Sequence, residues 1–248
     1  MKKELIGLLC SFAIVVVMLM SVAVFASTDT RIFVESATQL ISAIQSAKES
    51  DNIVLTENID IDTAIEITST VIINLNGKTL TALNDTEGNG IFWVKEGGNL
   101  TINGNGTINS ASQANDYSMA IWATNGGIVT INGGTFTNLD AKAFEDNGTT
   151  PNNNELIYAS RGGQIIINDG TFIGNYNNTK YGTRYTLNQK DEDLKTEEIE
   201  KGTILVKGGK YYGYNPAESL SENPQANFLA DGYISTLEGD YYIVTKLA

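Results

Sequence analysis

The chain has 248 residues, and its 24 glycines, 3 prolines and many β-branched residues favour an all-β fold with many turns. Its formal net charge of −13 at neutral pH repels phosphate backbones and anionic lipids, which excludes nucleic acid as an expected partner. The sequence contains no histidine, and this excludes an imidazole base or an imidazole metal ligand within the chain.

Residues 1–26 are expected to be a secretory signal peptide. Lys2 and Lys3 precede a long apolar run, and "VFA" before Ser27 has the small residues of a cleavage site. The same run is long enough to span a bilayer if it is not cleaved, so a retained anchor is the alternative. We therefore expect a secreted or cell-surface protein with no membrane contact beyond this segment.

Residues 27–62 are predicted to form an N-terminal cap that contains a helix. Leu40, Ile41 and Ile44 are spaced as on one face of a helix, and the segment "DNIVL" that follows favours a first strand. A stack of repeats leaves an apolar end open to water, and a helix over that end would cover it.

Residues 63–215 contain a repeated pattern of short apolar segments and glycine turns. The clearest copies are "IFWVKEGGNLTINGNGTIN" (91–109), "AIWATNGGIVTINGGTFTN" (120–138) and "LIYASRGGQIIINDGTFIG" (156–174), with partial copies at 64–81 and 201–215. Each full copy holds three short strands and two tight turns, and the paired glycines permit positive φ. This pattern describes one coil of a solenoid, in which equivalent strands of neighbouring copies pair.

Stacked copies place equivalent side chains in columns. The third strands supply an interior column made of Leu80, Ile108, Phe136, Phe172 and Tyr211. The second turns supply asparagines at matching positions, namely Asn103, Asn132 and Asn168. We expect these amides to form a hydrogen-bonded ladder that ends at Lys207.

With its helical cap, this arrangement resembles the right-handed parallel β-helix proteins of the pectate lyase type, from about Ile32 to about Tyr214. The resemblance implies an all-β, single-stranded right-handed parallel β-helix with three short strands per coil. Residues 216–248 are expected to form a C-terminal cap, because "GYIST" and "YYIVT" predict a β-hairpin. This tail, with "ADGY" followed by "YYIVT", resembles those of secreted β-helix proteins of gut bacteria and their phages. This fold hosts lyases, hydrolases, adhesins and phage fibres, so the resemblance implies no single activity.

In enzymes of this type, substrates lie along the outer face of one sheet, for which the first strand of each copy is the candidate. Alternation along these strands predicts one outward set: Ile91, Trp93, Ala120, Trp122, Leu156 and Tyr158. Trp93, Trp122 and Tyr158 would then form a ligand-binding platform for sugar rings, and Glu66 is expected to join this face. The alternative is that these rings are core, or lie beneath the loops at 139–155 and 175–197.

Catalytic candidates are sparse. Hydrolysis needs two carboxylates across a cleft, and Glu66 has no evident partner. The resemblance implies that a lyase would need a base and a cation; the candidate bases are Lys95, Arg161 and Arg184. Asp85 and Glu87 in "NDTEGNG" have the ligand type for Ca²⁺, although a polar turn needs no metal.

The sequence therefore predicts a non-catalytic secreted or cell-surface β-helix protein without a required cofactor. It would bind an extracellular polysaccharide or another surface through the aromatic face and the loops between coils. Two alternatives stay open: a polysaccharide lyase or depolymerase, and a purely structural adhesin or phage-derived module.

Overall fold

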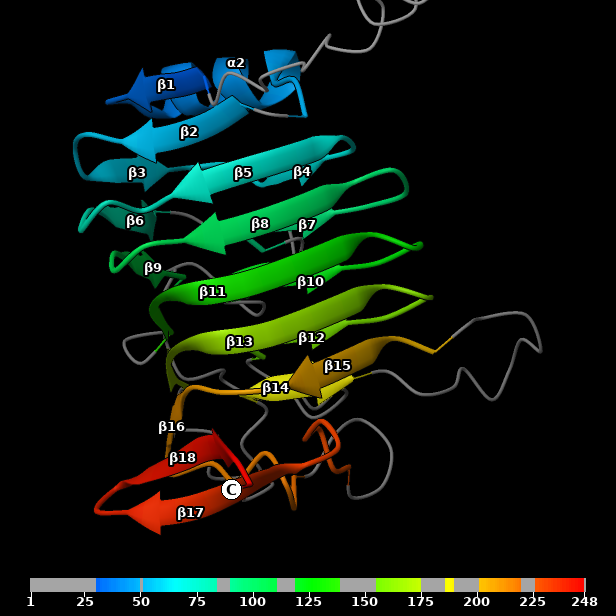
Figure 1. Ribbon diagram of the computed structural model, residues 1–248. Coiled ribbons are helices and arrows are strands. Elements are labelled where there is room, and N and C mark those ends of the chain that lie inside the picture. Colours follow the sequence, from blue (N-terminus) through cyan, green and yellow to red (C-terminus); the bar gives the residue numbers. More distant parts are fainter. Residues whose placement is uncertain are drawn as a thin grey trace, which may run out of the picture.

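The computed structural model describes residues 30–49, 51–83, 90–110, 119–138, 155–174, 186–189, 201–219 and 226–247. Within these ranges the chain is mostly β, with one short helix and parallel sheets, which confirms the all-β prediction (Figure 1). Among the described residues, no helix has both the length and the apolar character that a membrane span requires. The expected signal peptide at 1–26 lies outside the described residues.

The N-terminal end of the stack is covered by a helix, as predicted. Strand β1 (Thr30–Val34) pairs in parallel with β2 (Asp51–Leu55), and α2 (Ala37–Ser46) connects them. The Oγ atom of Ser36 accepts a hydrogen bond from the backbone N–H of Gln39 at 3.4 Å, which caps the first turn of the helix. The helix buries Leu40 and Ile44 against the core.

The first strands of the repeats form a separate parallel sheet of five strands. In sequence order they are β4 (Ile65–Ile67), β7 (Phe92–Val94), β10 (Ile121–Ala123), β12 (Ile157–Ala159) and β14 (Leu187–Gln189). Each strand pairs with the equivalent strand of the next repeat, so that Ile121 lies opposite both Phe92 and Ile157.

The second and third strands of the repeats belong to the larger sheet of thirteen strands. The second strands are β5 (Thr70–Asn74), β8 (Asn99–Asn103) and β15 (Thr203–Val206), and the third strands are β3 (Ile59–Ile61), β6 (Thr79–Ala82), β9 (Thr107–Asn109) and β16 (Lys210–Tyr212). β11 (Ile128–Thr137) and β13 (Gln164–Ile173) contain both kinds, because each continues through the second turn with a shift in register.

Both predicted columns are present. The interior column is fully buried, and its rings stack: the centroids of Phe136 and Phe172 are 5.1 Å apart, and those of Phe172 and Tyr211 are 4.9 Å apart. In the second turns, Nδ2 of Asn132 donates to Oδ1 of Asn103 at 2.9 Å, and Nδ2 of Asn168 donates to Oδ1 of Asn132 at 2.8 Å. The amide ladder therefore links three successive repeats along the stacking direction.

The two glycines of each pair have different roles. The first has a positive φ, at 79° in Gly97 and Gly126 and 75° in Gly162, as the turn requires. The second needs glycine for a different reason: a Cβ there would overlap the backbone carbonyl oxygen of the preceding repeat. The overlapping pairs are Gly98 with Ile67, Gly127 with Val94, and Gly163 with Ala123; Gly202, which follows Lys201 rather than a glycine, overlaps Ala159 in the same way. Positive φ, the predicted reason, thus explains only the first glycine.

A hairpin closes the C-terminal end, as predicted. β17 (Tyr233–Glu238) and β18 (Tyr241–Lys246) pair antiparallel, and β18 also pairs antiparallel with β16 (Figure 1). Tyr214, buried beneath this end, donates its hydroxyl hydrogen to the backbone oxygen of Leu187 at 3.0 Å and contacts the hydroxyl of Ser219.

Replacing the second glycine of a pair should be more destabilising than replacing the first. Gly127→Ala places a Cβ on the carbonyl group of Val94 and should lower the free energy of unfolding by about 1–3 kcal/mol. Gly126→Asn is the matched control, because Gly126 faces open space and asparagine tolerates its left-handed backbone, so its loss should be below about 1 kcal/mol. Denaturant unfolding measures both, and equal losses would contradict the contact.

Alkaline conditions should destabilise the C-terminal end. Burial raises the pKa of Tyr211 and Tyr214 well above their ordinary value near 10. Above about pH 10 the unfolded chain loses these phenolic protons while the folded chain keeps them, so the free energy of unfolding should be level below that pH and fall above it. Tyr214→Phe should make the fall shallower in denaturant titrations. An unchanged slope in this variant would contradict the assignment.

Candidate functional site

The outer face of the five-stranded sheet carries one column of side chains in register. Its members are Glu66, Trp93, Trp122, Tyr158 and Asn188, one from each strand. Glu66 joins the aromatic residues at the predicted position, and its side chain is exposed. The three aromatic residues are half-buried, whereas their neighbours in each strand are fully buried. We call this set the aromatic column.

The rings of the aromatic column cover one another. The centroids of Trp93 and Trp122 are 5.6 Å apart with an angle of 16° between the ring planes, and those of Trp122 and Tyr158 are 6.0 Å apart with an angle of 29°. Strands about 4.8 Å apart leave room for side chains on this face only when the rings stack. The column therefore presents ring edges outward, rather than the open ring faces of the predicted platform.

Lys95 closes the N-terminal end of the aromatic column. Its Nζ atom lies 2.7 Å from Oε2 of Glu66 and 4.1 Å from the centroid of the Trp93 ring. The side chains of Lys95 and Glu66 are 24% and 49% exposed, so the pair is accessible from solvent. As a candidate base, Lys95 would have to leave both contacts before it could take a proton from a substrate.

Hydrogen bonds fix the centre of the column. Nε1 of Trp122 donates to Oγ of Ser160 at 2.8 Å, and this hydroxyl donates to Oγ1 of Thr124 at 3.2 Å. Nε1 of Trp93 is buried and has no hydrogen-bond partner among the described residues. The two indoles, which look equivalent in the sequence repeat, are therefore held differently.

Glu155, which sequence reasoning missed, is a buried carboxylate at the C-terminal end of the column. Its Oε1 accepts a hydrogen bond from Nδ2 of Asn188 at 2.9 Å, and Asn188 lies beside Tyr158. Glu155 directly precedes β12, which is three strand spacings, or about 14 Å, from the strand that carries Glu66. Carboxylate pairs that hydrolyse glycosidic bonds are roughly 5–9.5 Å apart, so these two acids do not form such a pair.

The start of the first strands differs from the prediction. Ile91, Ala120 and Leu156, expected to point outward, are fully buried. In each repeat the strand begins at the residue that follows this position, so the alternation of side chains along the strand does not extend to it. The accessible surface of this sheet is consequently narrower than predicted.

The remaining candidates do not assemble into a catalytic centre. Arg161 is exposed in a turn with a φ of 48°, where the preceding repeat has Asn125 at 49°, and it forms no ion pair with any other described residue. Arg184, Asp85 and Glu87 lie outside the described residues. Over the described ranges, no three acidic, cysteine or histidine side chains lie close enough together to hold a metal ion.

Comparisons with protein-family models, with curated proteins and with solved structures found no match for this chain. The geometry of the aromatic column is therefore the main basis for a functional proposal.

The stacking of the two indoles should be visible by circular dichroism. The chain has only two tryptophans, and their near-parallel stacking at 5.6 Å should couple their transitions into a two-signed band. Trp93→Phe and Trp122→Phe should each remove this band. Trp122→Phe should also cost more stability, by about 1 kcal/mol, because it leaves the Ser160 hydroxyl without its donor. A band that survives in both variants would show that it does not arise from the two indoles, and a wild-type spectrum without the band would contradict their coupling.

Proposed function

We propose that this chain is a secreted or cell-surface right-handed parallel β-helix protein that binds an extracellular glycan without cleaving it. Register-matched pairing of equivalent strands, the amide ladder and the stacked interior rings all support three strands per coil. Crossovers between parallel strands of one sheet are right-handed in nearly all proteins, which supports that handedness. Export rests on the apolar segment at 1–26 and its small-residue cleavage site.

The observation that supports glycan binding most directly is the accessible end of the aromatic column. Glu66 offers a hydrogen-bond acceptor and Lys95 a donor for sugar hydroxyls, next to the apolar edges of Trp93 and Trp122. Sugars need this combination of polar and apolar contacts. Ring stacking and the hydrogen bond from Trp122 to Ser160 hold the indole rings in place before a ligand binds, which lowers the conformational entropy lost on binding.

A binding role without cleavage follows from the placement of the charged groups. Glu66 and Glu155 are too far apart for glycoside hydrolysis, and Lys95 is engaged by two neighbours. No cluster of carboxylates accompanies Arg161 among the described residues. These observations support a binding protein over a lyase.

A purely structural module is the second candidate. The stacked rings favour it, because each covers a face of its neighbour and leaves only edges for a ligand. In that case the aromatic column would stabilise the stack of repeats from outside, as the interior column does from inside.

Polysaccharide microarrays combined with a screen for released reducing or unsaturated ends test the proposal. We expect the protein to bind at least one neutral polysaccharide, since its net charge of −13 disfavours acidic ones, and to release no product. Lys95→Met and Glu66→Gln should each weaken binding about tenfold, the loss of one hydrogen bond to a charged group. Lys78→Met is the matched control, because Lys78 forms a surface ion pair with Glu57 away from the column.

Other results would overturn the proposal in distinct ways. Product formation that Arg161→Ala abolishes would identify a lyase. The absence of both binding and product would leave the structural module. Binding that is unaffected by Lys95→Met, Glu66→Gln and Trp122→Ala would place the ligand elsewhere on the molecule.

A further inference from the structure

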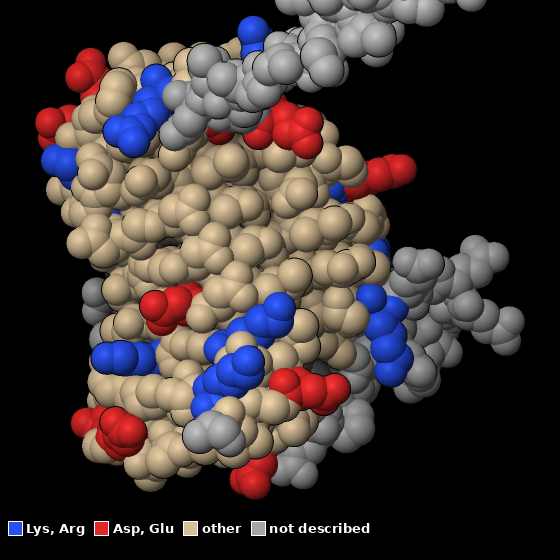
Figure 2. Space-filling view, in the orientation of Figure 1, with Lys and Arg blue, Asp and Glu red and all other residues tan. Residues whose placement is uncertain are grey.

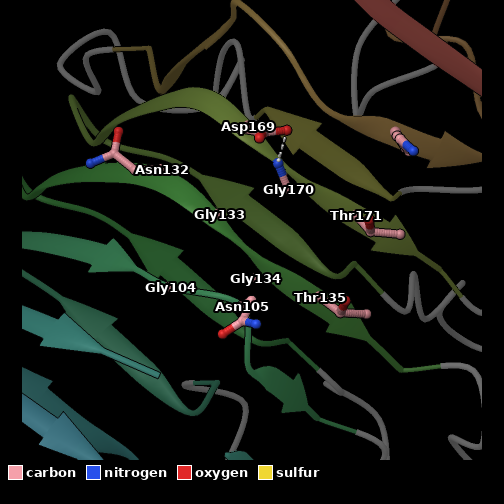
Figure 3. Close-up of a pocket in the computed structure, with 10 residues that line it drawn as sticks. Gly104, Asn105, Asn132, Gly133, Gly134, Thr135, Asp169, Gly170 and Thr171 are labelled. Carbon is pink, nitrogen blue, oxygen red and sulfur yellow. Dashed lines mark hydrogen bonds between the residues drawn. The ribbon is translucent and has the colours of Figure 1, made fainter. Parts of the chain in front are cut away.

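A groove of about 500 Å³ lies at the second turns of three successive repeats, away from the aromatic column. Its floor is backbone, with Gly133 at the centre, and Figure 3 shows Asp169 and Asn105 on opposite sides of that glycine. Asn132 and Lys210 also line it. The volume falls within the range of about 300–1,000 Å³ that small-molecule sites occupy.

Stacking explains the bare floor of the groove. A Cβ at Gly133 would lie 2.9 Å from the backbone oxygen of Gly104, and one at Gly134 would lie 2.8 Å from Cδ1 of Leu75. The floor is thus a product of the fold. Specificity has to come from the side chains on the rim.

Two of these side chains are exceptions to the repeat. Asp169 stands where other repeats have glycine, at Gly104, Gly133 and Gly208. Lys210 stands where the preceding repeat has Thr171, its partner in the paired strands. The neighbouring repeats fold without either charge, so stacking requires neither a carboxylate nor an ammonium group here.

Both charged groups are exposed and available to a ligand. Oδ1 of Asp169 accepts a hydrogen bond from the N–H of Gly170 at 2.8 Å, which holds the carboxylate in place while the residue stays exposed. Lys210 forms no ion pair with any described residue. Asn132 is fixed by the amide ladder, so the rim is rigid on this side too.

The surroundings favour an uncharged ligand. Figure 2 shows no Lys, Arg, Asp or Glu over β5, β8 and β11, while charged side chains gather toward both ends of the stack. The groove itself offers one charge of each sign, and the net charge of −13 repels anions. A carboxylate, an ammonium group and amides together provide acceptors and donors for neighbouring hydroxyl groups.

We propose, on the basis of the glycan-binding function above, that this groove is a second ligand site that takes a neutral sugar unit of a polysaccharide. Asp169 accepts hydrogen bonds from ring hydroxyls, Lys210 donates to them, and the glycine floor allows the ring to approach the backbone closely. A peptide would need a free strand edge or an apolar pocket. The groove has neither, because β11 and β13 are paired on both sides.

Repeat-matched variants make the test sharp. Asp169→Gly and Lys210→Thr each restore the residue that a neighbouring repeat carries at that position, so the fold should persist, and a thermal unfolding curve checks this. Glu96→Asn is the control: it removes one charge at the distant first turn, where the next repeat has Asn125. Affinity electrophoresis in gels containing mannan, galactan, xylan, mixed-linkage β-glucan or polygalacturonate measures binding.

We expect at least one of the four neutral polysaccharides to retard the protein and polygalacturonate not to. Asp169→Gly and Lys210→Thr should each weaken retardation about tenfold, and Glu96→Asn should leave it unchanged. Retardation that both groove variants retain would overturn the groove site while leaving glycan binding intact. Stronger retardation by polygalacturonate would overturn the neutral class. If no gel retards the protein and the microarrays are also blank, both proposals fail.

Calorimetric titration with a zwitterionic dipeptide tests whether the groove binds peptides instead of sugars. The charges of the dipeptide match those of Asp169 and Lys210, yet we expect no measurable heat. Binding that Asp169→Gly abolishes would show that the groove takes peptides and would overturn the sugar assignment.

Discussion

The spacing of the whole stack depends on a contact between a glycine backbone and a carbonyl group. In four successive first turns the last glycine of the turn lies so close to the oxygen of the preceding repeat that no side chain fits. A side chain there would push neighbouring repeats away from the spacing of about 4.8 Å that parallel pairing requires. The amide ladder and both ring columns need the same spacing, so they form only because these turns allow it.

This spacing allows aromatic rings to stack both inside the fold, along the larger sheet, and outside it, along the five-stranded sheet. The interior rings of Phe136, Phe172 and Tyr211 stack with centroids 5.1 and 4.9 Å apart, while the outer rings are 5.6 and 6.0 Å apart. The inner rings are fully buried, and the outer rings are packed less closely and end at the ion pair of Lys95 and Glu66. The inner column stabilises the fold, and the outer one has accessible polar groups at its end.

Alignment of the sequence repeats predicts the contacts that form between equivalent residues of successive repeats. Predicting the amide ladder, the interior column and the position of Glu66 required only that equivalent residues of successive repeats stack. All three are present in the structure. Contacts between non-equivalent positions were not predictable in this way. Lys95 reaches Glu66 on the neighbouring strand diagonally, and the angle between stacked rings varies from 8° to 29° although all of them lie on adjacent strands.

The positions at which the first strands begin account for another difference between the prediction and the structure. Alternation failed at Ile91, Ala120 and Leu156 because the strands begin after these residues. Glu155 was missed because it lies just before the residues to which alternation was applied, although an acid at a position held by Gly90 and Met119 in other repeats was a usable signal.

The reversed direction of β18 also bears on how such a protein can lengthen during evolution. Tandem duplication extends a stack when a new copy finds a parallel edge to join, and here the last edge is occupied by an antiparallel strand. A duplicated copy appended after the hairpin could not reach β16, and would meet β17 of the cap, which pairs only with β18 among the described strands. A copy inserted within the stack, between α2 and β16, can instead join as a complete turn without disturbing either end.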